Sequence, residues 1–436
     1  MDIKDIKIVE WYSQDIPSQI EGFLKRTPFP PEVEAIARDV ILDVRKRGDV
    51  ALLDAIARFD NVTFTKGELA VSREELSNAR SKVDSSFISS VHQSHNNVVA
   101  FAQASIKKDW FMSAPKGGVL GEFFVPFERV GVYIPGGTAP LVSTAIMTVT
   151  LAKVAGVQEI VAVSPVGQSK KMNEYILYAL EVAGATEIYK VGGIQAIAAL
   201  AYGTETIGKV QKIVGPGNAY VTAAKKLVYG DVAVDLIAGP SEIAILADEN
   251  APAEVLAADM LSQAEHGSGY EKALLVVTSM RLAHRVAEEL VKQTEALPRK
   301  EVVEKVLKDG CLIVVVNTLE KGMEVCNKFA PEHLELILNE PRNWVKKVKN
   351  AGAVFAGLWT PECVGDFVAG PSHVLPTGGA AAMFSGLTVD DFRKRISMMS
   401  FTRADLKNVL ETIEVFSRVE GLEAHARSAR IRFFGR

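Results

Sequence analysis

The feature that most constrains this chain is a change of hydrophobic pattern near Val130. From there on, short apolar segments of strand length alternate with segments whose apolar residues recur at helical spacing. Strands that are separated by helices need crossover connections, and such connections build parallel sheets. The alternation therefore predicts an α/β protein.

The alternation forms two series with no convincing repeat between them. The first series contains expected strands at 131–134, 159–164, 187–191 and 212–214. The second contains expected strands at 242–246, 273–278, 311–316, 334–338 and 352–355. The pattern predicts two tandem Rossmann-like doubly wound units, with a helical N-terminal region and a C-terminal helical tail.

This pattern divides the chain into five segments. We expect residues 109–127, which are rich in Gly, Pro and aromatics, to be a connector near the end of the mainly helical region. The segments are an N-terminal arm (1–25), a mainly helical region packing on the second α/β unit (26–129), the first α/β unit (130–238), the second α/β unit (239–382) and a C-terminal helical tail (383–436).

Composition excludes several functional classes. The 436 residues carry a formal net charge of −4, and no Lys/Arg run is long enough to bind nucleic acid. No apolar run approaches the roughly 20 residues of a membrane span, and the charged N-terminus does not resemble a signal peptide. The three cysteines show no CxxC spacing and fit reduced thiols. We therefore expect a cytoplasmic protein with no nucleic-acid or membrane partner.

Glycine-bearing loops follow or precede several expected strands. They are Val191–Gln195, Val214–Asn218 and Gly239–Glu242. In doubly wound sheets, ligands bind beyond the carboxyl ends of the strands, where we expect such loops to lie. None of these loops matches GxGxxG, so spacing alone does not identify a dinucleotide site, and ordinary tight turns remain an alternative.

Other segments place ionisable side chains at helix or strand ends. Gln263 and His266 are three residues apart on an expected helix that ends near Gly267, so they share one face. Glu332 and His333 precede an apolar strand and form a candidate acid/base pair. Each segment alone also fits a capping or solvent-exposed role. Jointly, Gln263, His266, Asp366 and His425 offer nitrogen and oxygen donors that suit zinc or a similar divalent ion.

Seven motifs in order make the chain similar to the histidinol dehydrogenase family over nearly its whole length. The chain departs from the family at Phe367, where Tyr is frequent, and at Ser372, where Asn commonly precedes the histidine. The motifs are Glu128–Pro140, Val191–Ala201, Val214–Tyr220, Ile237–Glu242, Leu261–His266, Ala330–Glu335 and Gly365–Thr377.

This resemblance implies an enzyme that oxidises L-histidinol to L-histidine through bound L-histidinaldehyde, with two NAD+, one water and one zinc ion per subunit. It places the dinucleotide on the first α/β unit, and the metal and catalytic residues on the second. By resemblance, the zinc ligands are Gln263, His266, Asp366 and His425, and the acid/base pair is Glu332 and His333. Substrate contacts fall on Ser241, His373 and Glu420, together with His333 and the four metal ligands, and dinucleotide contacts fall on Tyr133, Gln195 and Asn218.

The resemblance also implies a homodimer whose C-terminal tails cross, so that Glu420 and His425 enter the partner's site. The tail is too short to bury its own apolar face as an independent domain, which agrees with this expectation. Three alternatives stay open at this point: a related dehydrogenase for another small amino alcohol or diol, a zinc hydrolase in which Glu332 activates water, and a non-catalytic metal- or nucleotide-binding protein.

Overall fold

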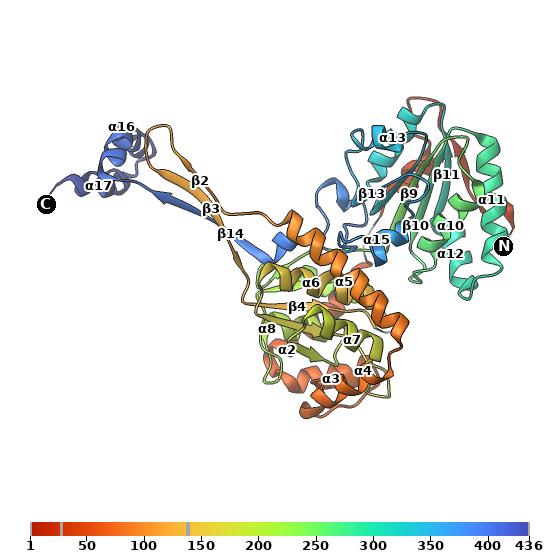
Figure 1. Cartoon of the computed structure of the whole chain (residues 1–436), viewed down its shortest axis with the longest axis horizontal. Helices are drawn as coiled ribbons and strands as arrows, with labels where there is room; N and C mark the ends of the chain where they lie inside the picture. The colour runs from red at the N-terminus through yellow and green to blue at the C-terminus, as the bar shows by residue number, and fades with distance from the viewer. Residues whose placement is uncertain (1, 27–28, 137–139, 435–436) are drawn as a thin grey trace.

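A computed structural model describes residues 2–26, 29–136 and 140–434. Two parallel sheets form two separate units, and a narrow antiparallel sheet extends away from them (Figure 1). The expected turn at Pro135–Pro140 falls partly on residues 137–139, which lie outside the described residues. Among the described residues, no helix is both long and apolar enough to cross a lipid bilayer.

The first unit contains a five-stranded parallel sheet with the order β6-β5-β4-β7-β8. Its strands are β4 (Arg129–Tyr133), β5 (Glu159–Val163), β6 (Glu187–Tyr189), β7 (Lys212–Val214) and β8 (Ala233–Val234). The helices between them are α6 (Val142–Ala155), α7 (Glu174–Ala183), α8 (Gly193–Tyr202) and α9 (Ala219–Val228). Successive side chains of a strand point to opposite faces, so Val132 packs against α6 and α7 while Tyr133 packs against α8 and α9.

The second unit contains a six-stranded parallel sheet with the order β1-β11-β10-β9-β12-β13. Its strands are β1 (Ile8–Glu10), β9 (Glu242–Ala247), β10 (Lys272–Val277), β11 (Cys311–Val315), β12 (His333–Ile337) and β13 (Ala353–Ala356). Helices α10 (Ala253–Ala264), α11 (Met280–Thr294) and α12 (Lys300–Gly310) cover one face, and α1 (Ser18–Leu24) and α13 (Leu319–Phe329) cover the other. Two shorter helices are α14 (Pro341–Val345) and α15 (Glu362–Phe367).

The structure confirms a mixed α/β chain with parallel sheets and with helices near both ends. Apart from β1, the strands of the two sheets follow the same spatial order, with the first strand in the centre and the fourth beside it. Five short 3-10 helices complete the described elements: η1 (Ile3–Asp5), η2 (Lys66–Glu68), η3 (Ala380–Ala382), η4 (Val389–Phe392) and η5 (Ile431–Phe433).

The N-terminal helical region packs on the first unit, so our expectation that it packs on the second was wrong. Helix α2 lies on α8 and α9, and α5 lies on α6. The reason is that α6 and α8 are apolar around most of their circumference and need a second covering layer. The four helices that form this layer are α2 (Pro31–Arg47), α3 (Asp49–Phe59), α4 (Arg73–Lys82) and α5 (Ser85–Ser105).

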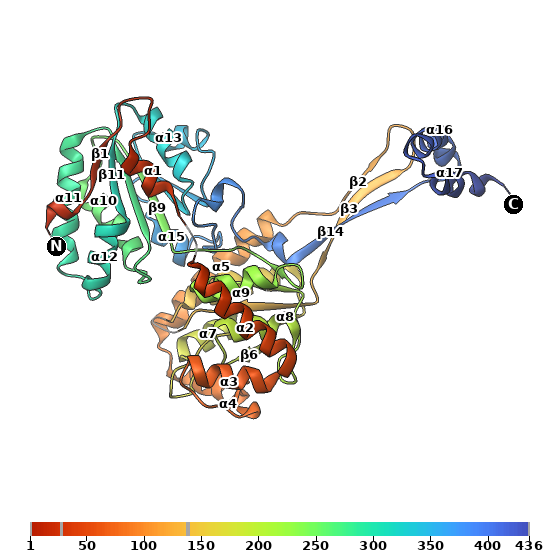
Figure 2. The same ribbon diagram turned by 180° about the vertical axis from the view of Figure 1, so that it is seen from behind.

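The expected connector and the start of the tail are strands, which corrects two further expectations. Strands β2 (Trp110–Ser113) and β3 (Val119–Pro126) pair antiparallel, and β14 (Arg393–Ser400) pairs with β3. The two α-helices of the tail, α16 (Arg403–Glu420) and α17 (Glu423–Arg430), come only after β14. The three strands form an extended structure that carries both helices well away from the two units (Figures 1 and 2). We call these three strands the arm from here on; the name does not refer to residues 1–25.

Candidate metal and catalytic site

The predicted catalytic residues lie at the amino edge of the second sheet. Glu242 opens β9 and His333 opens the neighbouring strand β12, so Glu332 lies just before that strand. Helix α10 runs antiparallel to the strands and ends at Ala264, which brings Gln263 to the same edge. Our expectation that loops of this kind lie at carboxyl ends therefore fails for Gly239–Glu242, because this loop precedes its strand.

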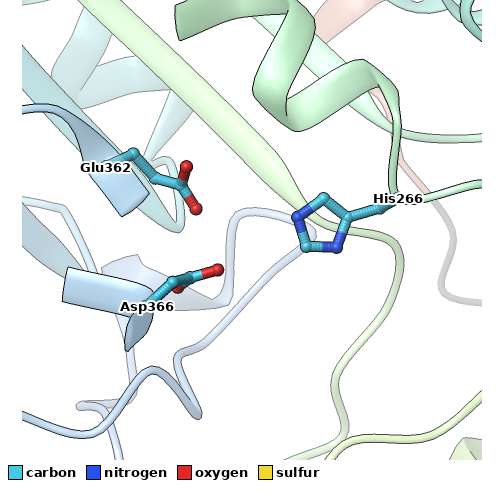
Figure 3. Close-up of side chains that lie close together, drawn as sticks. All are labelled: His266, Glu362 and Asp366. Carbon is cyan, nitrogen blue, oxygen red and sulfur yellow. The ribbon is translucent and has the colours of Figure 1, made fainter. Parts of the chain in front are cut away.

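Three side chains converge beside this edge in a way that could hold a metal ion, and we call this group the metal cluster. His266 follows the end of α10, and Glu362 and Asp366 both lie on α15 (Figure 3). One donor atom from each of the three lies within 4.8 Å of the other two. The sequence reasoning selected His266 and Asp366 but missed Glu362. The signal was present, because Glu362 precedes Asp366 by one helical turn and therefore shares its face.

The electrostatics of this cluster favour a bound cation. Burial raises the pKa of Glu362, and the neighbouring Asp366 carboxylate raises it further. Burial also raises the pKa of Asp366. Beside the cluster, the acceptor atoms His333 Nε2 and Glu362 Oε1 are buried and have no hydrogen-bond partner among the described residues. A divalent ion beside these groups would stabilise the charged carboxylates, and the nitrogen and oxygen donors suit zinc.

His333 is held in one defined protonation form. Its Nδ1 lies 3.1 Å from the backbone oxygen of Glu242 and 3.0 Å from Oε1 of Gln263. Both atoms are acceptors, so Nδ1 carries the proton and Nε2 keeps its lone pair. Nε2 faces the metal cluster, at 3.7 Å from Oδ1 of Asp366. Burial lowers the pKa of His333 to about 3, so the ring is neutral and can accept a proton at Nε2.

Glu332 is buried beside His333, and the backbone of Glu242 holds both residues. The backbone N–H of Glu242 donates to Glu332 Oε2 over 2.9 Å. Burial raises the pKa of Glu332 well above its ordinary value, and the carboxylates of Asp366, Glu242 and Glu362 add to the effect. A carboxylate with a raised pKa is a stronger base, which suits a group that must remove a proton from water.

The site lies where the two units meet. His373 donates from Nδ1 to the backbone oxygen of Asp366 over 3.0 Å, and its Nε2 lies 3.2 Å from the Thr144 hydroxyl on α6 of the first unit. Ser241, which is also a predicted substrate contact, is half-buried and directly precedes Glu242. The structure thus brings together Ser241, Gln263, His266, Glu332, His333, Asp366 and His373.

The structure does not bring Glu420 and His425 to this place within one chain. Glu420 is the last residue of α16 and His425 lies in α17, and both are exposed. The arm holds these helices far from the metal cluster of the same chain, as both views show (Figures 1 and 2).

The three predicted dinucleotide contacts lie at the carboxyl edge of the first sheet. Tyr133 ends β4, Gln195 lies in α8 after β6, and Asn218 precedes α9 after β7. The backbone N–H of Gly193 donates to the Tyr133 hydroxyl over 3.1 Å, and Gln195 Nε2 donates to Asp60 Oδ2 over 3.0 Å. Asn218 caps α9 through its side-chain oxygen. Asp60, which follows the end of α3, thus contacts a predicted dinucleotide residue from outside the α/β pattern.

Comparison with known proteins gives a consistent result. The family model described as histidinol dehydrogenase matches residues 25–433. A histidinol dehydrogenase from Carboxydothermus hydrogenoformans is 43% identical over 417 residues, covering 95% of this chain and 97% of the relative. One from Geobacillus kaustophilus is 46% identical over 394 residues, covering 90% and 92%. The crystal structure of histidinol dehydrogenase from Elizabethkingia anophelis superposes with a TM-score of 0.93 at 34% identity, covering 98% of each chain. The chain therefore belongs to the histidinol dehydrogenase family.

Proposed function

We propose that this chain is an NAD-dependent dehydrogenase that oxidises L-histidinol to L-histidine through L-histidinaldehyde, consuming two NAD+ and one water. Family membership suggests the substrate. The observation that carries the proposal is the position of His333 Nε2, which has no hydrogen-bond partner among the described residues and lies 3.7 Å from the carboxylate of Asp366 in the metal cluster. A base in this position can act on a substrate that the cluster holds.

The proposed metal is one zinc ion per subunit, held by Gln263, His266 and Asp366 and by His425 of a second copy. When bound, zinc supplies a Lewis acid that fixes the substrate through its nitrogen atoms. The geometry supports this through the convergence of His266 and Asp366 with Glu362.

The two catalytic side chains take different roles in this proposal. His333 accepts the proton of the substrate alcohol at Nε2 in the first oxidation. Glu332 removes a proton from the water that adds to the aldehyde, and this hydration prepares the second oxidation. NAD+, when bound, accepts the hydride in each step. His373, which contacts Thr144 of the first unit, and Ser241 orient the substrate.

The first unit is the proposed dinucleotide side, with contacts from Tyr133, Gln195 and Asn218. We interpret both units as Rossmann-like and doubly wound, with limits at 130–238 and 239–382. The strand order supports this interpretation. Apart from β1, the second and third strands of each unit lie on one side of its first strand, and the fourth and fifth lie on the other side, so the switch point is between the first and fourth strands. Doubly wound proteins bind ligands at this switch point, beyond the carboxyl ends of the strands.

The proposed assembly is a homodimer in which each tail (383–436) completes the site of the other subunit. Exposed apolar side chains on α16 support it, since Phe416 is 61% and Val419 77% exposed. Apolar side chains are also exposed on and just before α15, which carries Glu362 and Asp366: Trp359 is 90% and Phe367 60% exposed. Exchange of an identical element is a low-cost route to a symmetric dimer. We propose a cytoplasmic location for this biosynthetic enzyme.

A substrate panel tests the proposed function. Purified protein with zinc should form NADH from L-histidinol at a higher kcat/KM than from other amino alcohols or diols. A preference for another alcohol would identify a related dehydrogenase. Cleavage of esters or amides without NAD+ would favour the zinc hydrolase, and zinc binding without any turnover would favour a binding protein.

A further inference from the structure

One residue outside the reacting groups, Glu242, fixes both predicted catalytic side chains through its backbone. Its N–H donates to Glu332 over 2.9 Å, and its carbonyl accepts from His333 Nδ1 over 3.1 Å. The second contact keeps the proton on Nδ1 and so leaves Nε2 free to accept one. A small shift of the Glu242 backbone would therefore disturb both groups at once.

The side chain of Glu242 is in turn held by Arg26. Arg26 Nη1 donates to Glu242 Oε1 over 2.7 Å, and the two side chains are only 8% and 3% exposed. Arg26 comes from the segment that follows α1, on the other face of the second sheet from α10. An ion pair in this position is short, buried and shielded from solvent.

The same guanidinium also holds the segment that leads into the catalytic pair. Arg26 Nη2 donates to the backbone oxygen of Phe329, and the Arg26 Cζ atom lies 4.1 Å from the centre of the Phe329 ring. Phe329 ends α13, three residues before Glu332. Arg26 thus connects the two backbone segments between which Glu332 and His333 are held.

We propose that Arg26 is a positioning residue for the oxidation: it clamps Glu242 to the end of α13 and so sets the orientation of Glu332 and His333. This proposal rests on the roles given above to Glu332 and His333. The planar guanidinium matters, because its separate N–H groups reach the carboxylate and the carbonyl together, whereas a lysine ammonium is a single point charge.

The kinetic test compares Arg26→Met, Arg26→Lys and Glu242→Gln with Lys25→Met. Lys25 is the matched control, since its side chain is 77% exposed and pairs only loosely with Glu21 at 3.8 Å. Arg26→Met should lower kcat by about 10- to 100-fold with little change in the KM for histidinol, because the reacting groups are misplaced rather than removed. Arg26→Lys should recover part of this loss, and Lys25→Met should match the unaltered protein. Arg26→Met combined with Glu242→Gln should lose no more than Arg26→Met alone, because both act through one ion pair.

A second readout does not depend on turnover. Nitrogen NMR of histidine-labelled protein, with the His333 signal assigned by its loss in His333→Asn, reports whether Nδ1 carries the proton. Arg26→Met should change the Nδ1-protonated fraction of His333, and Lys25→Met should leave it unchanged. If Arg26→Met is too unstable to purify, Arg26→Lys and Glu242→Gln carry the same comparison. Folded Arg26 variants with unchanged kcat and an unchanged His333 signal would overturn the proposal. An altered His333 signal in a protein that never oxidises histidinol would instead refute the proposed function and leave the clamp intact.

Discussion

Oε1 of Gln263 lies 3.0 Å from Nδ1 of His333, so a proposed metal ligand is hydrogen-bonded to the proposed base. Gln263 is fully buried, and its other amide atom has no partner among the described residues. This contact links the environment of the metal to the orientation of the imidazole. We therefore expect changes at the metal cluster to affect the base as well as the binding of substrate.

Removal of the metal should abolish histidinol oxidation, and added Zn2+ should restore it. The reason is that His266 and Asp366 would lose the ion that holds the substrate against His333. Metal content and activity are measured on the same chelated and reconstituted samples. His284→Ala, which removes an exposed histidine on α11, serves as a control and should keep both. Full activity in metal-free protein would refute the zinc assignment.

Glu362→Gln should weaken zinc binding even though sequence reasoning did not select this residue. Glu362 adds negative charge beside His266 and Asp366, and its removal lowers the attraction for a cation. Residues that support metal ligands typically contribute about 10- to 100-fold in affinity. Competition with a coloured chelator measures the affinity without any turnover. An affinity equal to that of the unaltered protein would show that Glu362 takes no part in the site.

Glu332→Gln and His333→Asn should affect the two oxidations differently. Glu332→Gln should slow the oxidation of supplied histidinaldehyde more than its reduction by NADH, because only the oxidation needs activated water. His333→Asn should slow both reactions. Acid/base groups of this kind contribute about 10²- to 10⁴-fold each. Pre-steady-state absorbance of NADH measures both reactions, and equal losses in Glu332→Gln would contradict the separate roles.

Two inactive variants should restore each other's activity if the tails cross. His266→Ala and His425→Ala chains, refolded together, should form heterodimers with one intact site per dimer. That site would combine Gln263, His266 and Asp366 of the His425→Ala chain with His425 of the other. Mixed tags allow the heterodimer to be purified and assayed alone. Heterodimers no more active than either homodimer would show that each tail serves its own chain.

Gly215→Ala should destabilise the first unit and weaken NAD+ binding more than Gly230→Ala does. Both glycines have left-handed φ angles, +112° and +104°, which cost an alanine about 1–2 kcal/mol. An added Cβ at Gly215 would lie 2.2 Å from the backbone oxygen of Tyr133, whereas at Gly230 it would meet nothing within 4 Å. Gly215 is also held by Asp235 and Lys225. Urea unfolding and NAD+ titration measure the two effects, and equal values for the two variants would exclude this role of Gly215.

Local sequence patterns predicted the parallel α/β units because the spacing of apolar residues and the position of turn residues reflect the geometry of single helices and strands. They did not predict the arm. Strand β14 pairs with β3, which is more than 260 residues away in the sequence, and most of its side chains are exposed, so the strand shows no alternation of apolar and polar residues. Local patterns also did not predict where α2 and α5 pack. An apolar helix face indicates that the face is buried, but it does not indicate which element covers it.

The sequence by itself determined the type of most elements in the two α/β units and, through seven motifs, the family to which the chain belongs. The tertiary structure alone decided that the predicted catalytic pair lies at an amino edge, that Glu362 joins His266 and Asp366, and that Arg26 reaches Glu242. It also placed α16 and α17, which carry Glu420 and His425, far from α15 of the same chain (Figure 1). The physical reason is that these contacts join residues from separate elements, and their meeting depends on how whole layers pack, which no short-range pattern encodes.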